Sequence, residues 1–493
     1  MAAITPINAD NIRKACVLMP DYSTSDVDYQ HYDPQRNLSA LLPHAQVDHV
    51  LLNKLTTYKQ LKELSKKGYD IFINLCEGYL DWSVPSIDVI HCLDLLQLPY
   101  TGPSALLYDP TKELMKYVAF TCGVATPAHV LVSSIDDLAQ VVPQLQFPLF
   151  VKPSKAGDSL GIDEASKVHT ESALREKTVQ LLDEYGPLLV EEYVDGREFT
   201  VLVIASPDPT QQPQALKPIE YIFPEGTAYK TYALKTSALH PSANIPVADP
   251  QLDAQLRDAA LRIFNGFNAV GYARMDFRMD AAGRLFFLEI NFTCSVFYTE
   301  GYEGSADYIV REDGIGQAGF LQAIINEGLA RYARLHKPYR LQGSLHKGYG
   351  IYATRNIAAG EIIFHGEGSA QRIITRRFVE THWDPGMQEM FRRYAWPISR
   401  EVFILWDDNP ASWAPQNHSC APNTAYDGLD VKATRIIGRG EELTLDYATF
   451  LDEHMEPFTC HCGAGNCRGR IVGEKGNSVT RMEEKRGVND QPD

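Results

Sequence analysis

Oxygen-bearing side chains alternate with apolar residues along two neighbouring strand-like segments, GYARMDFRMD and GRLFFLEINFT. Side chains alternate across a strand, so each segment turns its polar residues to one face and its apolar residues to a buried core. The polar faces carry Arg274, Asp276, Glu289 and Asn291. A hairpin would gather Asp276, Glu289 and Asn291 into an all-oxygen set suited to magnesium, with phosphate oxygens in its shell. Arg274 beside them would neutralise charge on a phosphoryl group during transfer.

Two lysines precede these strands, each next to a feature that can bind phosphate. Lys112 opens a helix in DPTKELMK, and Lys152 ends an apolar strand in FPLFVKPSKAGDSLGI. The small-residue loop after Lys152, which includes Ser159, can fold its backbone N–H groups over phosphate oxygens while the lysines add charge. Glycine loops and surface lysines are common, so this pattern alone also fits a solvated loop.

The segment VEEYVDGREFT joins a strand to a turn and offers a different kind of ligand contact. Its strand delivers Glu191 and the backbone of Glu192, Tyr193 and Val194, and a hinge backbone of this kind can hydrogen-bond the edge of adenine. Glu198, after the turn, can hold ribose hydroxyls. An ordinary β-hairpin with surface acids is the alternative that this segment alone leaves open.

In this order, the segments resemble the ATP-grasp enzymes, and most closely the D-alanine–D-alanine ligase group, over residues 10 to about 335. The resemblance implies a three-part fold whose lobes enclose ATP and two magnesium ions. Phosphates would be bound by the loop with Ser159 and by Lys112, Lys152 and Lys235 (in TYALKT). Adenine would be bound at Glu191 to Val194, ribose at Glu198, and the magnesium ions at Asp276, Glu289 and Asn291. The implied reaction phosphorylates a carboxylate, and an amine then attacks the acyl-phosphate.

Substrate-side positions depart from that family. Ala156 precedes Gly157 where the family usually has a glutamate, and Thr293-Cys294-Ser295-Val296 stands where it typically has a Pro-Gly-Met stretch. The first strand leads into Pro20-Asp21-Tyr22-Ser23 in place of a Gly-rich turn. Because the nucleotide side keeps its pattern, we expect ATP to be used, with another amino acid or small carboxylate in place of D-alanine.

Beyond residue 340, four further motifs follow in order: KGYGIYATRNIAAGEII, NHSCAPNT, GEELTLDY and CHCGAGNCRG. Cys460, Cys462 and Cys467 supply three thiolates, and Cys420 is the only other cysteine nearby in the sequence. Four thiolates complete a tetrahedral zinc site. The spacing favours such a site over unrelated reduced thiols.

This stretch resembles the SET methyltransferases with a post-SET zinc segment, over about 340–471. The resemblance implies a small β-rich domain with a threaded, knot-like chain. S-adenosylmethionine would be bordered by Gly348, Tyr349, Gly350, Asn417 and His418. Tyr447 would be the catalytic tyrosine on the methyl-transfer axis. Residues 369–416 would form the methyl-acceptor side. Their four tryptophans could cage a cation, but we favour packing.

Periodicity indicates the elements that must position these residues. Strands are expected over 15–19, 45–52 and 70–75 with helices between them, which predicts a parallel α/β sheet, and a helix is expected over 316–335. The predicted fold class is multidomain α/β and α+β, with a pre-ATP-grasp α/β domain, two α+β ATP-grasp lobes and a β-rich SET domain. The predicted bounds are 10–105 for the pre-ATP-grasp domain, 106–337 for the ATP-grasp domain, 340–453 for the SET domain, 454–471 for the post-SET zinc segment and 472–493 for a flexible tail.

Composition narrows the remaining classes of function. The chain has 493 residues and a formal net charge of -17, which argues against a general nucleic-acid or membrane-surface partner. No apolar run reaches the roughly 20 residues of a membrane span, and the first residues lack a signal pattern, so we expect a cytoplasmic protein. Ligases of the resembled group are often dimers, so a homodimer is allowed.

Two functions therefore compete. A bifunctional small-molecule enzyme would make an amide from amino-acid-like substrates and N-methylate the substrate or product. A protein lysine methyltransferase would instead use its ATP-grasp part as a nucleotide-dependent sensor or docking domain. A non-enzymatic scaffold is disfavoured because both modules keep their binding residues.

Overall fold

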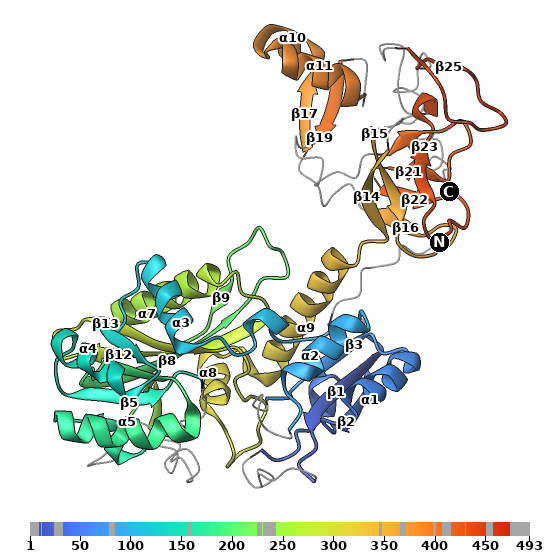
Figure 1. The fold of residues 1–493 in the computed structure, drawn as a ribbon. Coiled ribbons are helices and arrows are strands. Elements are labelled where there is room, and N and C mark those ends of the chain that lie inside the picture. Colours follow the sequence, from blue (N-terminus) through green and yellow to red (C-terminus); the bar gives the residue numbers. More distant parts are fainter. Residues whose placement is uncertain are drawn as a thin grey trace, which may run out of the picture. The chain divides into compact units, whose positions relative to one another are not determined.

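The structure of the chain is a computed structural model. It describes residues 9–10, 12–23, 33–77, 84–155, 160–223, 229, 243–344, 348–364, 371–397, 401–406, 416–428, 430–449 and 457–473. The chain divides into two compact units, Met1–Leu335 (the N-terminal unit) and His336–Asp493 (the C-terminal unit). Figure 1 shows the ribbon coloured along the sequence.

The N-terminal unit begins with a three-stranded parallel sheet in the order β2-β1-β3. Its strands are β1 (Lys14–Pro20), β2 (Gln46–Leu52) and β3 (Ile71–Asn74). The apolar run of β1 is buried along nearly its whole length, as expected for the central strand of a parallel sheet. Helices α1 (Thr57–Leu64) and α2 (Ile87–Leu95) pack on one face, and α9 (Gly316–Leu335) packs on the other.

Two antiparallel sheets form the rest of this unit. The four-stranded sheet has the order β4-β7-β5-β6, with β4 (His129–Val132), β5 (Leu149–Pro153), β6 (Lys167–Val168) and β7 (Leu188–Glu192). Helices α4 (Leu138–Gln144) and α5 (Glu171–Tyr185) pack against it. The six-stranded sheet has the order β11-β10-β8-β12-β13, with β9 paired to β8.

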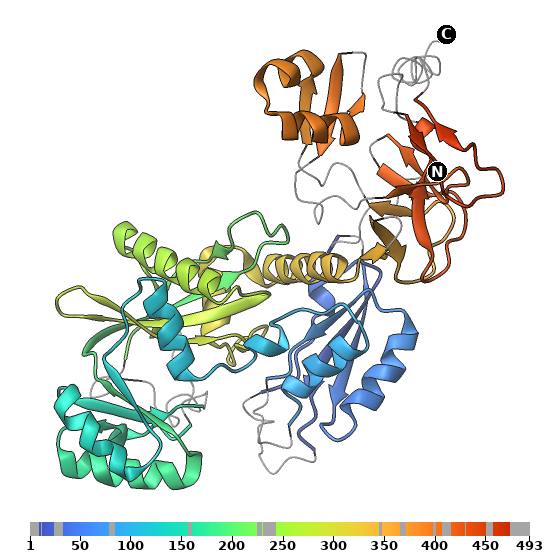
Figure 2. The ribbon, with the colours of Figure 1, turned by 45° about the horizontal axis from the view of Figure 1, so that its top comes forward.

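The strands of the six-stranded sheet are β8 (Gly196–Ile204), β9 (Gln214–Ala215), β10 (Ile219–Tyr221), β11 (Asn244–Pro246), β12 (Tyr272–Asp280) and β13 (Leu285–Asn291). Helices α3 (Lys112–Thr121) and α7 (Pro250–Gly266) cover one face (Figure 2). Helix α8 (Ser305–Asp313) packs with α9 on the other face. Thr111 caps the start of α3 by accepting a hydrogen bond from the Leu114 backbone N–H at 3.2 Å.

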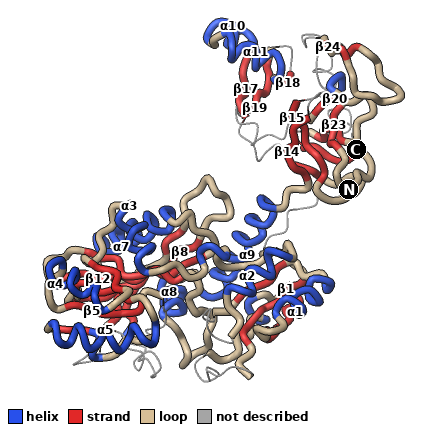
Figure 3. The backbone as a smooth tube through the Cα atoms, viewed as in Figure 1, coloured by secondary structure: helices blue, strands red, loops and turns tan. Residues whose placement is uncertain are grey.

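The C-terminal unit is built mainly from short strands and loops (Figure 3). One sheet has the order β14-β15-β23-β20, with β14 (Tyr339–Ser344), β15 (Gly348–Ala353), β20 (Asn417–His418) and β23 (Glu442–Leu445). A second, β16-β22-β21, contains β16 (Ile362–Phe364), β21 (Thr424–Asp427) and β22 (Asp430–Ala433). A two-stranded sheet pairs β24 (Phe458–Thr459) with β25 (Arg470–Ile471).

The segment between the SET motifs folds into a small α/β unit. Its sheet has the order β17-β19-β18, with β17 (Gln371–Thr375), β18 (Trp396–Pro397) and β19 (Val402–Trp406). Helices α10 (Arg376–His382) and α11 (Pro385–Tyr394) accompany it. Trp383 packs edge-on against Phe391, whereas the side chains of Trp396, Trp406 and Trp413 lie outside the described residues.

The predicted fold class is confirmed: a parallel α/β sheet, two antiparallel lobes and a β-rich C-terminal unit are all present. The expected helix over 316–335 is α9, and the three expected strands are β1, β2 and β3, whose ends differ from the expected ones by at most one residue. In the part of the chain that the structure describes, we find no helix with the length and hydropathy of a membrane span.

Candidate functional site

A cavity of about 120 Å³ lies in the N-terminal unit, lined by residues of both antiparallel sheets. Most of the residues expected to bind ATP and magnesium line it: Lys152, Glu191, Glu192, Tyr193, Val194, Glu198, Arg274, Asp276 and Glu289. Ser159 and Lys235, which were also expected to contact phosphate, lie outside the described residues. The predicted side chains, drawn from segments more than 130 residues apart, therefore converge on one space.

The predicted hairpin of β12 and β13 is present, and its register pairs Asp276 with Glu289 and Arg274 with Asn291. Arg274 Nη2 lies 3.2 Å from Asp276 Oδ2, and Asn291 Nδ2 lies 3.5 Å from both Asp276 Oδ2 and Glu289 Oε1. A half-turn of the Asn291 amide would present its oxygen to the same point. Two carboxylates and an amide at these separations fit the oxygen ligands of magnesium.

Lys152 and Glu191 line the cavity, and the buried side chains of Lys112 and Lys116 lie next to its acidic residues. The two carboxylate oxygens of Glu191 lie 2.5 Å from Lys152 Nζ and 2.8 Å from Lys116 Nζ, and Lys112 Nζ lies 3.9 Å from Glu289 Oε2. Burial opposes the ionisation of Glu191, but the charges of Lys116 and Lys152 outweigh it and lower its pKa to about 2. Glu191 is therefore the counter-ion of two lysines. The sequence pattern predicts Glu191 at adenine and does not predict these ion pairs.

Lys116 was not among the predicted site residues. It is buried on α3 and donates a hydrogen bond to the Phe287 carbonyl of β13 at 3.3 Å, and burial lowers its pKa to about 8. A signal was present in the sequence, because Lys116 lies one helical turn beyond Lys112 in DPTKELMK and so shares its face. Its acceptors come from β7 and β13, far away in the chain, and helical spacing does not identify them.

The hinge between the two antiparallel sheets is three residues long, from the end of β7 at Glu192 to the start of β8 at Gly196. Gly196 has φ of 149°, and a Cβ atom there would lie 2.1 Å from the Met279 carbonyl oxygen, so the turn requires glycine. Tyr193 stacks near Phe150 with ring centroids 6.1 Å apart, and Tyr229 meets Phe150 edge-on at 5.0 Å. These rings give the cavity an aromatic end suited to a flat base.

A network of buried and half-buried polar groups lies at the substrate-side positions of the N-terminal unit. Arg36 pairs with Asp33 at 2.9 Å and with Glu77 at 3.1 Å, and Glu77 accepts from Ser295 Oγ at 2.5 Å. Tyr298 donates to Asp33 at 2.7 Å. Burial raises the pKa of Glu77 to about 7 despite the charge of Arg36. The network connects the end of β3 to the loop after β13, where the sequence departs from the family pattern.

In the C-terminal unit, the glycine and asparagine motifs meet across the sheet. Asn417 Nδ2 donates to Glu442 Oε1 at 2.8 Å and to the Tyr349 carbonyl at 3.3 Å. A Cβ atom on Gly350 would lie 2.7 Å from Asn417 Nδ2 and from Glu442 Oε1, so a larger residue would force these side-chain ends to shift. Tyr349 contributes its backbone oxygen to this contact, while its side chain is exposed. Gly348 is exposed, with φ of 69°.

Tyr447 is held between the NHSC motif and the tail. Its hydroxyl donates to the Gln416 carbonyl at 2.5 Å, and its backbone N–H donates to His418 Nδ1 at 3.1 Å. Because Nδ1 accepts, Nε2 of neutral His418 carries the hydrogen and faces Cys420 Sγ at 3.4 Å. The rings of His418 and Phe458 lie edge-on to that of Tyr447.

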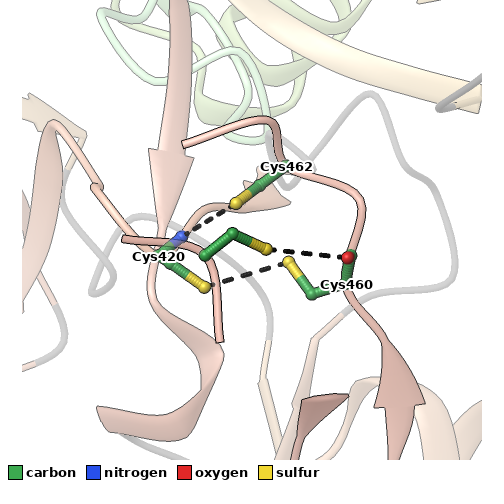
Figure 4. A group of neighbouring side chains, drawn as sticks. Cys420, Cys460 and Cys462 are labelled. Carbon is green, nitrogen blue, oxygen red and sulfur yellow. Dashed lines mark hydrogen bonds between the residues drawn. The ribbon is translucent and has the colours of Figure 1, made fainter. Parts of the chain in front are cut away.

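The four predicted metal-binding cysteines, Cys420, Cys460, Cys462 and Cys467, converge, with every sulfur within 4.8 Å of the others. Cys420 Sγ and Cys460 Sγ are 3.9 Å apart, and Figure 4 shows Cys420, Cys460 and Cys462 around one point. Tetrahedral Zn–S bonds of about 2.3 Å place sulfurs about 3.8 Å apart, so the cage fits zinc. A hydrogen bond from the Cys420 backbone N–H lowers the pKa of Cys462 to about 6, which favours the thiolate form that metals bind.

Comparisons with known proteins agree with both parts. Residues 119–299 match the D-ala D-ala ligase C-terminus, and residues 348–448 match the SET domain. The D-alanine–D-alanine ligase of Bordetella petrii is 31% identical over 242 residues, which cover 48% of this chain and 70% of that protein. The uncharacterized protein y4sG of Sinorhizobium fredii is 31% identical over 258 residues, which cover 50% of this chain and 71% of that protein.

Among solved structures, the D-alanine–D-alanine ligase of Bacillus anthracis complexed with ATP has 19% identity and a TM-score of 0.49, covering 66% of this chain and all of that one. The fold and the sequence relatives together define the class of the N-terminal unit as an ATP-grasp ligase. The chain belongs to the D-alanine–D-alanine ligase family and carries, in addition, a SET domain of the methyltransferase family. It is an enzyme.

Proposed function

We propose that the chain is a bifunctional enzyme. The N-terminal unit joins a carboxylate to an amine through an acyl-phosphate at the expense of ATP. The C-terminal unit transfers a methyl group from S-adenosylmethionine to nitrogen of an amino-acid-like substrate or product. The observation that carries the first activity is the convergence of Asp276, Glu289 and buried Lys152 in one cavity, with Asn291 and Lys112 in contact with its carboxylates.

The ligase step follows from charge placement. A carboxylate oxygen of the substrate attacks the γ-phosphorus of ATP, and ADP leaves with the electron pair of the broken P–O bond. Lys112 and Lys152 supply positive charge at the phosphates, and Arg274 stands beside the metal-binding carboxylates where negative charge would develop. An amine then attacks the acyl carbon, phosphate leaves, and the amine loses a proton to solvent.

Asp276, Glu289 and Asn291 would hold magnesium, which neutralises charge between phosphate groups. Cys420, Cys460, Cys462 and Cys467 would hold zinc as a structural ion, because four cysteines leave no open position for a substrate. Asn417, His418 and the backbone of Gly348 to Gly350 would contact S-adenosylmethionine. These assignments are supported by the geometry of the side chains.

Methyl transfer needs alignment more than acid–base chemistry. The lone pair of a neutral amine attacks the methyl carbon in line, and the electron pair of the broken C–S bond stays on sulfur. Tyr447 is held by contacts at its hydroxyl and its backbone N–H, so its ring can define one wall of the transfer axis. The methylated nitrogen then releases a proton to solvent.

Mass spectrometry of reactions with ATP, S-adenosylmethionine and amino-acid pools tests this proposal. We expect amino-acid-dependent ADP and phosphate release together with a methylated amide product. If no amino acid or small carboxylate stimulates ADP formation, the ligase proposal is wrong.

The competing function is methylation of protein lysine, with the ATP-grasp part as a nucleotide-dependent docking domain. The formal net charge of -17 favours it to the extent that an acidic surface attracts basic peptide tails. Transfer of labelled methyl groups to protein bands of an extract, with no small labelled product, would favour this function over the first.

A further inference from the structure

One buried cation in the cavity, Arg278, is not among the residues proposed to bind phosphate or magnesium. Arg278 lies on β12 two residues beyond Asp276, so strand alternation turns it to the same side, and it lines the cavity. Only 3% of the residue is exposed. A guanidinium buried to this extent is tolerated where its donors are satisfied, so its partners indicate what it holds in place.

The partners of Arg278 belong to the segment that is proposed to bind the base and ribose, Glu191 to Glu198. Nη1 donates to the Val194 carbonyl at 2.8 Å, and Nε donates to Glu198 Oε2 at 3.3 Å. The guanidinium carbon lies 5.0 Å from the centre of the Tyr193 ring, within cation–π range. Arg278 and Glu198 are direct cross-strand partners in the β8–β12 register. Arg278, on the six-stranded sheet, thus hydrogen-bonds the hinge that leads to the four-stranded sheet.

We propose that Arg278 is a positioning residue for nucleotide recognition, which orients the Glu198 carboxylate and the hinge backbone toward the ribose and base of ATP. The inference rests on the proposed function and deepens it. Because Arg278 holds one oxygen of Glu198, the carboxylate keeps a single rotamer in which its other oxygen can accept from a ribose hydroxyl. Arg278 also balances the negative charge of Glu198 before the nucleotide binds.

Equilibrium binding of nucleotide to the full chain tests this role without turnover. ATP, 2′-deoxy-ATP and 3′-deoxy-ATP are titrated with magnesium in the absence of amino acids, into wild type, Arg278→Leu and Arg278→Lys. Arg197→Leu is the matched control, because Arg197 also pairs with a glutamate of this sheet, Glu220 at 2.6 Å, but its side chain is 48% exposed and does not line the cavity.

We expect wild type to prefer ATP over one deoxy analogue by roughly tenfold, the usual worth of a hydrogen bond to a charged group. Arg278→Leu should weaken ATP binding by a similar factor. The ratio of its affinity for ATP to its affinity for that deoxy analogue should then be close to one. Arg278→Lys, which keeps the charge but loses the fork of donors, should fall between them, and Arg197→Leu should leave the ratio unchanged.

The outcomes separate this inference from the proposed function. If Arg278→Leu weakens ATP and both analogues by the same factor, so that the ratio stays at its wild-type value, Arg278 supports only the fold and the inference is overturned. If Arg278→Leu does not fold, the ratio in Arg278→Lys decides in the same way. If wild type binds no ATP, the ligase proposal fails together with the inference.

Discussion

The two candidate sites are built in different ways. In the N-terminal unit, the site residues lie within strands or beside them, and several already satisfy one another, as Glu191 does with Lys116 and Lys152. In the C-terminal unit, site residues lie on β15 and β20 of one four-stranded sheet and directly after β23, and among the described residues the strands of the tail, β24 and β25, pair with each other. Both sites therefore use a sheet, but the second also needs a tail that its four cysteines bring to the sheet.

The difference teaches where each site should be vulnerable. A sheet register fixes side-chain positions without any ligand, so the nucleotide site should survive the loss of its cofactors and fail when one of its buried charges loses a partner. In the C-terminal unit, the tail with Cys460, Cys462 and Cys467 meets Cys420 at the cysteine cluster, so the methyl-donor site should fail when the metal is removed from these four cysteines.

Removal of the metal from the four cysteines should therefore have the largest effect on activity. Cys460→Ser, or a strong zinc chelator, should abolish methyl transfer, because a structural zinc ion contributes about 10–16 kcal/mol of folding free energy. Metal analysis should show about one zinc per chain in wild type and a loss in the variant, while ATP binding persists. Cys92→Ser, on α2 of the other unit, is the matched control. Loss of ATP binding in Cys460→Ser would contradict the independence of the two sites.

Removing one chemical group from each site should separate the activities. Glu289→Ala should lower amino-acid-dependent ADP formation by about 1000-fold, since a proposed magnesium ligand is lost, and should leave methyl transfer unchanged. Tyr447→Phe should lower methyl transfer and leave ADP formation unchanged. Both products are measured by mass spectrometry in one reaction. A single variant that stops both reactions would mean that they are strictly sequential or that the units depend on each other.

Breaking the lysine–glutamate network should destabilise the N-terminal unit by about 3–5 kcal/mol. Lys116→Met leaves Glu191, which is 4% exposed, with one of its two cationic partners. The double variant Lys116→Met/Glu191→Gln also removes the counter-ion of buried Lys152, so it should be destabilised further than the single variant. Urea unfolding monitored in the full chain measures both. Equal destabilisation by the single and double variants would show that the charge itself is unimportant.

Strand alternation and motif order made much of both sites predictable from the sequence. Polar–apolar alternation placed Asp276 and Glu289 on one face of a hairpin, but their direct pairing depends on a register shift between Asp276 and Phe277 that the pattern did not predict. The shift also leaves Leu288, expected on the core face, lining the cavity beside Glu289. The fourth cysteine could be identified because only Cys420 was nearby in the sequence, and its sulfur lies within reach of the other three. The roles assigned to these residues remain predictions.

Contacts between distant segments could not be predicted. Lys116 meets Glu191 and the Phe287 carbonyl, which are 75 and 171 residues away in the chain, and only the packing of α3 on the sheet brings them together. Arg278 continued the alternation of Arg274 and Asp276, yet its partners depend on the β8–β12 register. The contact of Ser295 with Glu77 likewise spans two different sheets and a loop.

A smaller effect is expected from one added methyl group in the C-terminal unit. Gly350→Ala would place Cβ 2.7 Å from Asn417 and Glu442, so those side chains must shift at a cost of about 1–3 kcal/mol. We expect S-adenosylmethionine to bind roughly 10-fold more weakly, measured by calorimetry. Gly343→Ala on the neighbouring strand is the control, because its nearest contact would be an ordinary 3.6 Å. Equal effects of the two variants would exclude a specific role for the close approach at Gly350.

The last effect concerns pH and returns to the N-terminal unit. Burial raises the pKa of Glu77 from 4.5 to about 7, so the folded state holds this proton more tightly than the unfolded chain does. The contribution of Glu77 to stability is therefore full below pH 4.5 and is lost as the pH rises to about 7, with a slope of at most about 1.4 kcal/mol per pH unit.

Glu77→Gln cannot titrate and keeps an acceptor for Arg36, so its urea midpoint should fall less than that of wild type between pH 5 and pH 7.5. Asp307, whose pKa burial raises to about 6, titrates in the same direction in both proteins and cancels in the comparison. Parallel pH profiles for wild type and Glu77→Gln would show that Arg36 keeps Glu77 ionised in the folded chain.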